Sequence, residues 1–80
     1  MKYIVFNEKD FIIIPDYMNH IDVVKDITQV KSAGTVRFYG AKSQAGEYVI
    51  VADCYGKSIS LGIESKPEED SDLISIALYI

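Results

Sequence analysis

The sequence predicts an α+β domain, with an antiparallel sheet of four to five strands, a short helix after the second strand and a C-terminal helix packed on one face. Three observations predict this fold. Short apolar runs bounded by turn residues recur along the chain, which is typical of strands. A four-residue polar link joins the first two runs, as in a hairpin. A proline followed by acidic residues opens the C-terminal segment, as at the start of a helix.

The first two predicted strands form the N-terminal hairpin. Residues 2–6 and 11–14 are apolar and rich in β-branched side chains, and the polar residues 7–10 connect them,. Pro15 ends the second strand because proline has no amide hydrogen to donate to a sheet.

A short helix is predicted at about 19–28. Asn19 can serve as its N-cap, and Asp22 three residues later approximates a capping box,. The apolar residues that follow have helical spacing and would share the buried face. These residues are Ile21, Val24 and Ile27.

Three runs in the middle of the chain have the period of strands. From Val30 onward apolar residues alternate, with Val36 and Phe38 on one face and Thr35, Arg37 and Tyr39 on the other,. Residues 40–46 are rich in turn formers and predict a flexible loop. Residues 47–55 are the strongest strand signal, and within them 48–52 are apolar on both faces, which is typical of a central strand,. In 58–63 three apolar residues, Ile59, Leu61 and Ile63, alternate with Ser58, Ser60 and Gly62, which predicts a further strand with a serine face.

The C-terminal segment fits two structures. Pro67 followed by three acidic residues favours a helix over about 67–78, because acids are stabilised near the positive end of a helix dipole,. The alternation of Ile74, Ile76 and Leu78 with smaller residues also fits a strand. The helix start is the more specific signal, so we expect a helix.

Size and composition predict a single domain, 1–80, that associates with itself. A chain this short buries only about 60% of its unfolded surface. Hydrophobic residues nevertheless make up 49% of the sequence. Either the core is unusually dense or an apolar face is covered by another copy or by a different partner, and we expect a homodimer.

Composition also excludes several classes of protein. The longest apolar runs fall far short of the roughly 20 residues of a membrane-spanning helix, so no membrane insertion is expected. Cys54 is the only cysteine, which is typical of the reducing cytoplasm,. Lysine and arginine form no stripe, so no direct binding to nucleic acid is expected. One histidine and one cysteine cannot supply a zinc site, and no cofactor or metal is expected,.

No complete catalytic motif is present, so the sequence predicts no enzyme. Gly56-Lys57-Ser58 matches the end of a phosphate-binding Walker loop, but Val51 stands where that loop needs its first glycine,. A tight turn with a left-handed Gly56 explains the stretch better. His20 at a helix start is more typical of a solvated site than of a general base. Cys54 in a half-buried strand is more typical of an inert core.

Negative charge is concentrated near the C-terminus. Residues 1–60 carry seven acids and seven Lys/Arg, so the net charge of −4 arises after residue 60. The acidic run suits a helix start, a surface that binds a basic site on a partner by imitating nucleic acid, or a solvated tail. Tyr39 and Tyr55 precede glycines at strand ends, and we expect both to be exposed. The predicted contact with a protein partner therefore comprises Tyr39, Tyr55, Glu64, Glu68, Glu69, Asp70 and Asp72.

Several separated elements, in their order and spacing, resemble a group of small phage and prophage proteins. The shared skeleton is P…H…SAG.V…YG.S.SLG..S.PED..LI and spans residues 15–74. Thr35 departs from it, as does the extra acidic residue after Pro67. The matching residues are Pro15, His20, 32–34, 55–62, 65–67, Glu69, Asp70, Leu73 and Ile74.

This resemblance implies a phage-related origin and no known enzyme activity. It implies a non-enzymatic protein in the host cytoplasm that binds a host protein and inhibits an antiphage defence system. A second hypothesis is a binder of a nucleotide-like signal, with a pocket at a dimer seam built from backbone amide groups. A third is a component of a phage particle. The pocket residues of the second hypothesis are His20, Ser32, Ala33, Gly34, Gly56, Lys57, Ser58 and Ser60.

Overall fold

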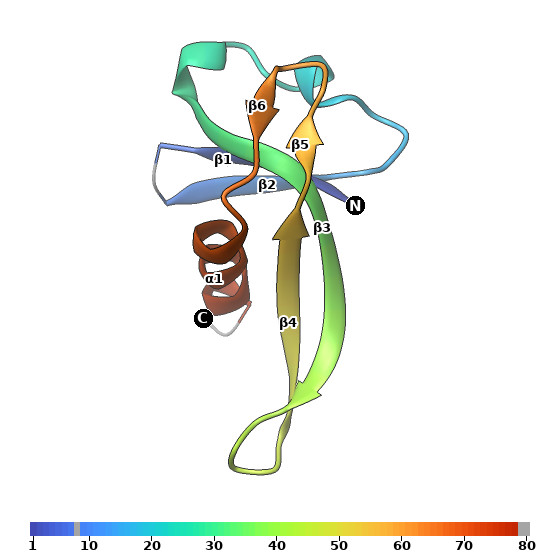
Figure 1. The fold of residues 1–80 in the computed structure, drawn as a ribbon, viewed down its shortest axis with the longest axis vertical. Helices are drawn as coiled ribbons and strands as arrows, with labels where there is room; N and C mark the ends of the chain where they lie inside the picture. Colours follow the sequence, from blue (N-terminus) through green and yellow to red (C-terminus); the bar gives the residue numbers. More distant parts are fainter. Residues whose placement is uncertain (8, 79–80) are drawn as a thin grey trace.

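A computed structural model describes residues 1–7 and 9–78 (Figure 1). The predicted α+β class is confirmed, with an antiparallel sheet of four strands and a C-terminal helix that packs on it. In chain order the described elements are β1 (Lys2–Phe6), β2 (Asp10–Ile14), the 3₁₀ turns η1 (His20–Asp22) and η2 (Ile27–Gln29), β3 (Val30–Lys42), β4 (Tyr48–Tyr55), β5 (Lys57–Ser58), β6 (Ile63–Glu64) and α1 (Pro67–Ala77).

The described strands of the main sheet lie in the order β2-β1-β3-β4, and every pair is antiparallel. The predicted N-terminal hairpin is confirmed, with Lys2 opposite Ile14 and Phe6 opposite Asp10. Asn7 follows β1 in a left-handed conformation, at φ 53°, which asparagine tolerates better than most residues,. β5 and β6 pair separately as a small hairpin.

Two hydrophobic cores lie on opposite faces of the sheet, because successive strand residues point to opposite sides. On one face, which we call the α1 face, Ile74 of α1 packs on Tyr3, Val5, Val36, Ala52 and Cys54. On the other, Leu61 from the β5–β6 hairpin and Val23 and Val24 from the segment between the 3₁₀ turns pack on Ile4, Ile14, Val30 and Ala33. β1 therefore contributes side chains to both cores.

The helix predicted at 19–28 is wrong, because this segment forms only the turns η1 and η2. The capping contact exists, since the Asn19 amide donates to the Asp22 carboxylate at 2.9 Å. Asp26 starts a second local turn by accepting hydrogen bonds from the Thr28 amide and hydroxyl. Such side-chain contacts compete with helical hydrogen bonds, and a helix this short is marginal on its own. Ile21 and Ile27 consequently remain exposed.

The β3–β4 hairpin extends beyond the rest of the molecule (Figure 1), and we call residues 38–50 the arm. Pairing continues to Lys42 opposite Tyr48, so the loop predicted at 40–46 is reduced to 43–47. β4 was predicted to be central, but it pairs only with β3 among the described strands and lies at an edge. Its apolar residues therefore have a different cause. On one face Ala52 and Cys54 pack under α1, and both faces of β4 continue into the exposed arm.

The strand predicted at 58–63 is also wrong, since 59–62 form the turn of the β5–β6 hairpin and only Ser58 and Ile63 at its two ends are strand residues. Gly62 adopts a left-handed conformation at φ 68°, and its amide donates to the Ser58 carbonyl at 2.9 Å. Leu61 is buried while Ile59 projects into solvent, so the expected alternation fails. The strands on either side of this turn have only two residues each, and so short a strand contains no alternating pattern that the sequence could reveal.

The C-terminal helix is confirmed and covers the edge of the sheet. Pro67 stands in its first turn, followed by three acids. The Ser71 and Ser75 hydroxyls, one turn apart, accept the Cys54 and Ala52 amides of β4 at 2.9 and 3.0 Å. An edge strand with free amides can pair with other chains, so α1 protects this part of β4.

No helix among the described residues has the length and apolar content needed to cross a membrane.

We predict that the protein loses stability as the pH rises above 9. Burial raises the pKa of the Cys54 thiol from its ordinary 9.0 to about 11. Burial and the hydrogen bond to Asp70 also raise the pKa of Tyr3. Between the unfolded and folded pKa values the native state binds more protons than the unfolded state, so the free energy of unfolding falls with rising pH.

Urea unfolding followed by circular dichroism at intervals between pH 8 and 11 measures this slope. One group contributes at most about 1.4 kcal/mol per pH unit. Cys54→Ala should flatten the dependence between pH 9 and 11. An equal slope in the wild type and this variant would contradict the assignment to Cys54.

Candidate functional site

Aromatic and charged side chains meet on the β3–β4 face opposite the α1 face. Arg37 pairs with Asp53 in the strand register, and its Nε lies 2.8 Å from the Asp53 carboxylate. The Arg37 guanidinium also lies over the Tyr55 ring, 5.8 Å from its centre. Tyr39 is two residues from Arg37 on the same face, and both tyrosines are exposed as predicted,.

Acidic residues of α1 adjoin this face at Asp53. A hollow of about 390 Å³ is lined by Asp53 and by Pro67, Glu68, Ser71 and Asp72 of the helix. The strand residues and the helix acids therefore form one continuous surface around Asp53. We call it the tyrosine–acid surface, and its residues are Arg37, Tyr39, Asp53, Tyr55, Glu68 and Asp72.

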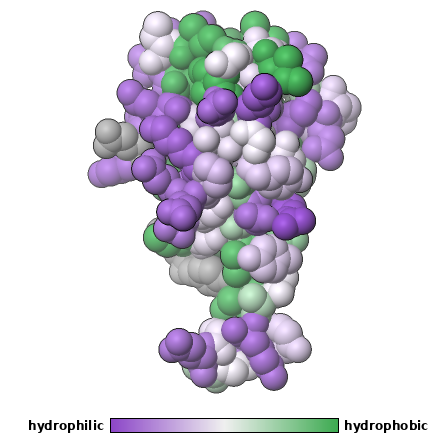
Figure 2. All heavy atoms as spheres, viewed as in Figure 1, coloured by the Kyte–Doolittle hydropathy of each residue, from purple (hydrophilic) through white to green (hydrophobic). Residues whose placement is uncertain are grey.

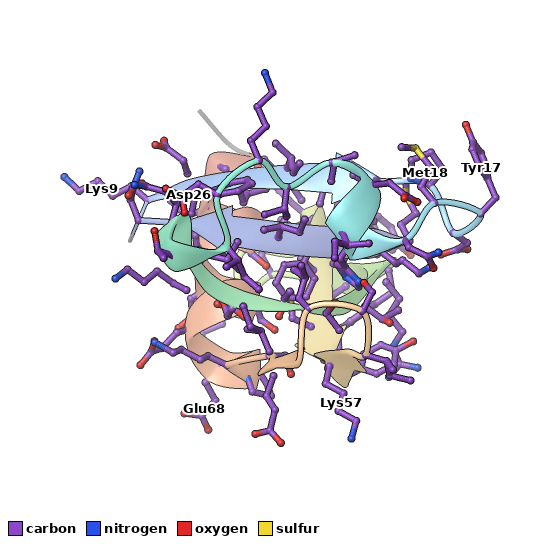
Figure 3. All side chains as sticks on the ribbon, turned by 90° about the horizontal axis from the view of Figure 1, so that it is seen from above. Lys9, Tyr17, Met18, Asp26, Lys57 and Glu68 are labelled. Atoms are coloured by element: carbon purple, nitrogen blue, oxygen red, sulfur yellow. The ribbon has the colours of Figure 1, made fainter. Side chains whose placement is uncertain are left out.

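Four of the seven predicted contact residues lie on the tyrosine–acid surface: Tyr39, Tyr55, Glu68 and Asp72. Glu69 lines a different hollow beside Lys31 and Lys66. Glu64 lies opposite Lys57 in the β5–β6 hairpin. Lys57 and Glu68 both point outward, on the same side of the molecule (Figure 3).

Asp70 requires a correction, because it is only 3% exposed and its carboxylate is used within the fold. Its carboxylate accepts hydrogen bonds from the Tyr3 hydroxyl at 2.5 Å, the Ser32 hydroxyl at 2.8 Å and the Lys66 amide at 2.9 Å. A buried carboxylate is tolerated when such donors replace water. Asp70 therefore joins β1, β3 and the start of α1.

The residues of the alternative ligand pocket meet, but most are used within the fold. His20 Nε2 donates to the Gly34 carbonyl at 2.9 Å, and both residues are buried. The Ile21 amide donates to Ser60, whose hydroxyl lies 3.4 Å from that of Ser58. Ser58 also accepts the Leu61 amide at 3.2 Å and is fully buried.

The glycines and neighbours of that alternative pocket are equally constrained. A Cβ at Gly34 would lie 2.5 Å from the Tyr55 carbonyl oxygen, so the chain segments are in direct contact there. The Gly56 carbonyl accepts both the amide and the hydroxyl of Ser65. Buried Ser32 donates to Asp70, and Ala33 packs in the second core. These contacts hold strands together and leave Ser60 and Lys57 at the surface.

The Cys54 thiol is buried and its pKa is raised to about 11, which leaves little thiolate at neutral pH,. Among the described residues, no cluster of His, Cys, Asp and Glu side chains is placed to hold a metal ion.

Sequence reasoning missed Arg37 and Asp53 as members of the surface. Alternation places Arg37 and Tyr39 on one strand face, but the partner across the sheet depends on register. Register is determined here by the length of the 43–47 loop together with the edge contacts of α1. The opposite charges at 37 and 53 were the available signal.

We predict that Asp70→Asn destabilises the fold by about 1.5–3 kcal/mol, because the amide keeps one acceptor oxygen but turns an NH2 group toward the remaining donors,. Asp72→Asn is the matched control, because it removes the same charge from an exposed residue in the same helix. It should change the free energy of unfolding by less than about 0.5 kcal/mol. Urea unfolding followed by circular dichroism compares the two. Similar effects of both variants would show that charge near the helix start, and not the buried network, determines stability.

Comparisons of the chain with protein-family models, curated proteins and solved structures found no match.

Proposed function

We propose that the protein acts by binding another protein through the tyrosine–acid surface. One observation carries the proposal. Tyrosines and an arginine from two strands converge with acids of a distant helix around Asp53, although the fold requires none of these side chains in its core. Tyrosine and arginine are enriched among the residues that contribute most to protein interfaces.

The charges of the surface favour a basic partner. The Arg37 guanidinium forms an ion pair with Asp53, so the two charges offset each other. Glu68 and Asp72 remain as exposed negative charges beside this pair. Complementary charge speeds diffusional encounter and orients the partners, whereas aromatic contact supplies most of the retained affinity. The partner therefore combines basic side chains with an apolar or aromatic centre.

The resemblance to small phage and prophage proteins supports a host protein as the partner, bound in the host cytoplasm. Inhibition of an antiphage defence system is the biological role we propose. Binding without catalysis is supported by three nucleophilic side chains, because the Ser32 and Ser58 hydroxyls are buried and hydrogen-bonded within the fold and the Cys54 thiol is buried. We also propose that the chain acts as a homodimer.

The alternative of a nucleotide-like ligand is less favoured, because its predicted amides and hydroxyls already have partners within the chain. Thermal shift with cyclic and linear nucleotides separates the two hypotheses, since a ligand that binds only the native state raises the melting temperature. Large symmetric oligomers in size-exclusion chromatography would instead favour a particle component.

We predict that the tagged chain retains a host protein from lysate and that binding weakens at high salt. Tyr55→Ala should weaken the purified complex by about 30-fold, as expected for loss of a central aromatic contact. The double variant Glu68→Lys and Asp72→Lys should slow association and remove its salt dependence. Biolayer interferometry with the identified protein measures both.

Two matched controls test the surface itself. Tyr17→Ala removes an exposed tyrosine from the loop after β2, and Glu69→Lys reverses an acid on the other side of α1. Neither should change the affinity by more than about twofold. Failure to retain any protein at either salt concentration, or equal losses in the controls, would refute the proposal.

A further inference from the structure

Large hydrophobic side chains remain exposed where the arm leaves the body. Phe38, Tyr48 and Ile50 lie on the α1 face of the arm, because they share a face with Val36 and Ala52 in the strand register,. Leu78 follows at the end of α1, one turn beyond Ser75 and toward the arm. We call these four residues the apolar corner, and their exposed fractions are 38%, 82%, 54% and 45% for Phe38, Tyr48, Ile50 and Leu78.

Gly40 lies within the apolar corner, and neither its backbone conformation nor its surroundings in the isolated chain require a glycine. It pairs with Ile50 in an uninterrupted register, so it marks no bulge. Its backbone is not left-handed, and a Cβ added there would meet no atom within 4 Å. Glycine weakens a strand, and in this position it is typical of a site where another backbone approaches closely.

The apolar corner has a positive charge at one end, Lys42, and the negative end of the α1 dipole at the other,. Lys42, at the outer end of the arm, is the charged residue on this face of the arm, and its Nζ lies over the Tyr48 ring. The described part of α1 has no basic residue in its last turn, so the negative end of the helix dipole lacks a cation of its own,. A two-fold axis across the arms would place Lys42 of each copy near the helix end of the other.

We propose that a second copy of this chain binds in the apolar corner, with the two arms antiparallel and Gly40 at their closest approach. This inference rests on the proposed homodimer and is independent of the proposed host protein. The corner exposes roughly 400 Å² of hydrophobic residues per copy. Since interfaces are about 60% apolar, the contact would bury on the order of 1,300 Å² in total, which is within the range of specific dimers.

Figure 2 shows hydrophobic residues on the arm just above its hydrophilic tip, as an interface with a polar rim requires,. The dimer leaves the tyrosine–acid surface accessible, because Tyr39 and Tyr55 lie on the opposite face of the same hairpin. Each copy would then present one tyrosine–acid surface, and the dimer would be bivalent.

Sedimentation equilibrium of the wild type and three variants tests the proposal. The wild type should form a dimer of twice the 9.0 kDa chain mass. Gly40→Val should raise the dissociation constant by about 10-fold to 100-fold, because its side chain fills the space of the approaching arm. Ala41→Val adds bulk at the neighbouring residue on the opposite face and should leave the constant unchanged. Lys42→Glu should weaken association, and less so at high salt.

Folding of the variants is measured at a dilution where the wild type is also monomeric. There Gly40→Val should unfold at the same or higher urea concentration than the wild type, since valine favours strands. A wild type that remains monomeric up to about 1 mM would overturn the proposal. So would a Gly40→Val variant that dimerises like the wild type, or an equal loss in Ala41→Val. Capture of a host protein by monomeric Gly40→Val would show that the two surfaces act separately.

Discussion

The buried carboxylate of Asp70 connects the two central strands of the sheet to the C-terminal helix by hydrogen bonds. Its three donors come from β1, from β3 and from the residue that precedes α1. Removing a carboxylate from water costs several kcal/mol, so the arrangement is stable only while all of these donors are in place. Because the donors come from two strands and from the residue before α1, the network favours one position of the helix on the sheet,.

The helix position determines what the rest of α1 does. With Asp70 and Ile74 directed into the core, helical periodicity brings Ser71 and Ser75 to the edge of β4,. Glu68 and Asp72 then face the hollow beside Asp53. One short helix thus completes a core, satisfies edge amides and supplies charge to the tyrosine–acid surface. The surface is therefore a consequence of the buried network, although none of its own residues belongs to that network.

Elements with strong local signals could be predicted from the sequence. The Asn7–Asp10 link, the alternation around Val36 and the start of α1 at Pro67 each depend on neighbours in the chain. The predictions were wrong where contacts between residues far apart in the sequence determine burial or the place of a strand in the sheet. Asp70 looks like its acidic neighbours, and its burial depends on Tyr3, 67 residues away. The apolar faces of β4 indicated burial, but periodicity cannot distinguish a central strand from an edge strand covered by a helix and extended into an exposed arm.

In the candidate site, too, some features follow from neighbours in the chain and others from contacts between distant residues. Exposure of Tyr39 and Tyr55 follows from their place at strand ends, whereas their proximity to α1 required the register of β3 and β4. The segment at 19–28 has helical spacing, but Asp26 offers its own backbone a local alternative. The hydroxyls and amides predicted for a ligand pocket are of the right chemical type for one. In the structure these groups form hydrogen bonds that connect β3, the β5–β6 hairpin and the loop at His20.

The link between Tyr3 and Asp70 has a consequence for synthesis of the protein. Asp70 leaves the ribosome 67 residues after Tyr3. Until then Tyr3 and Ser32 lack their acceptor, and the Ala52 and Cys54 amides lack the serines that cover them. The nascent chain therefore carries an open strand edge until α1 has emerged, and the contacts of α1 with β1, β3 and β4 form only then.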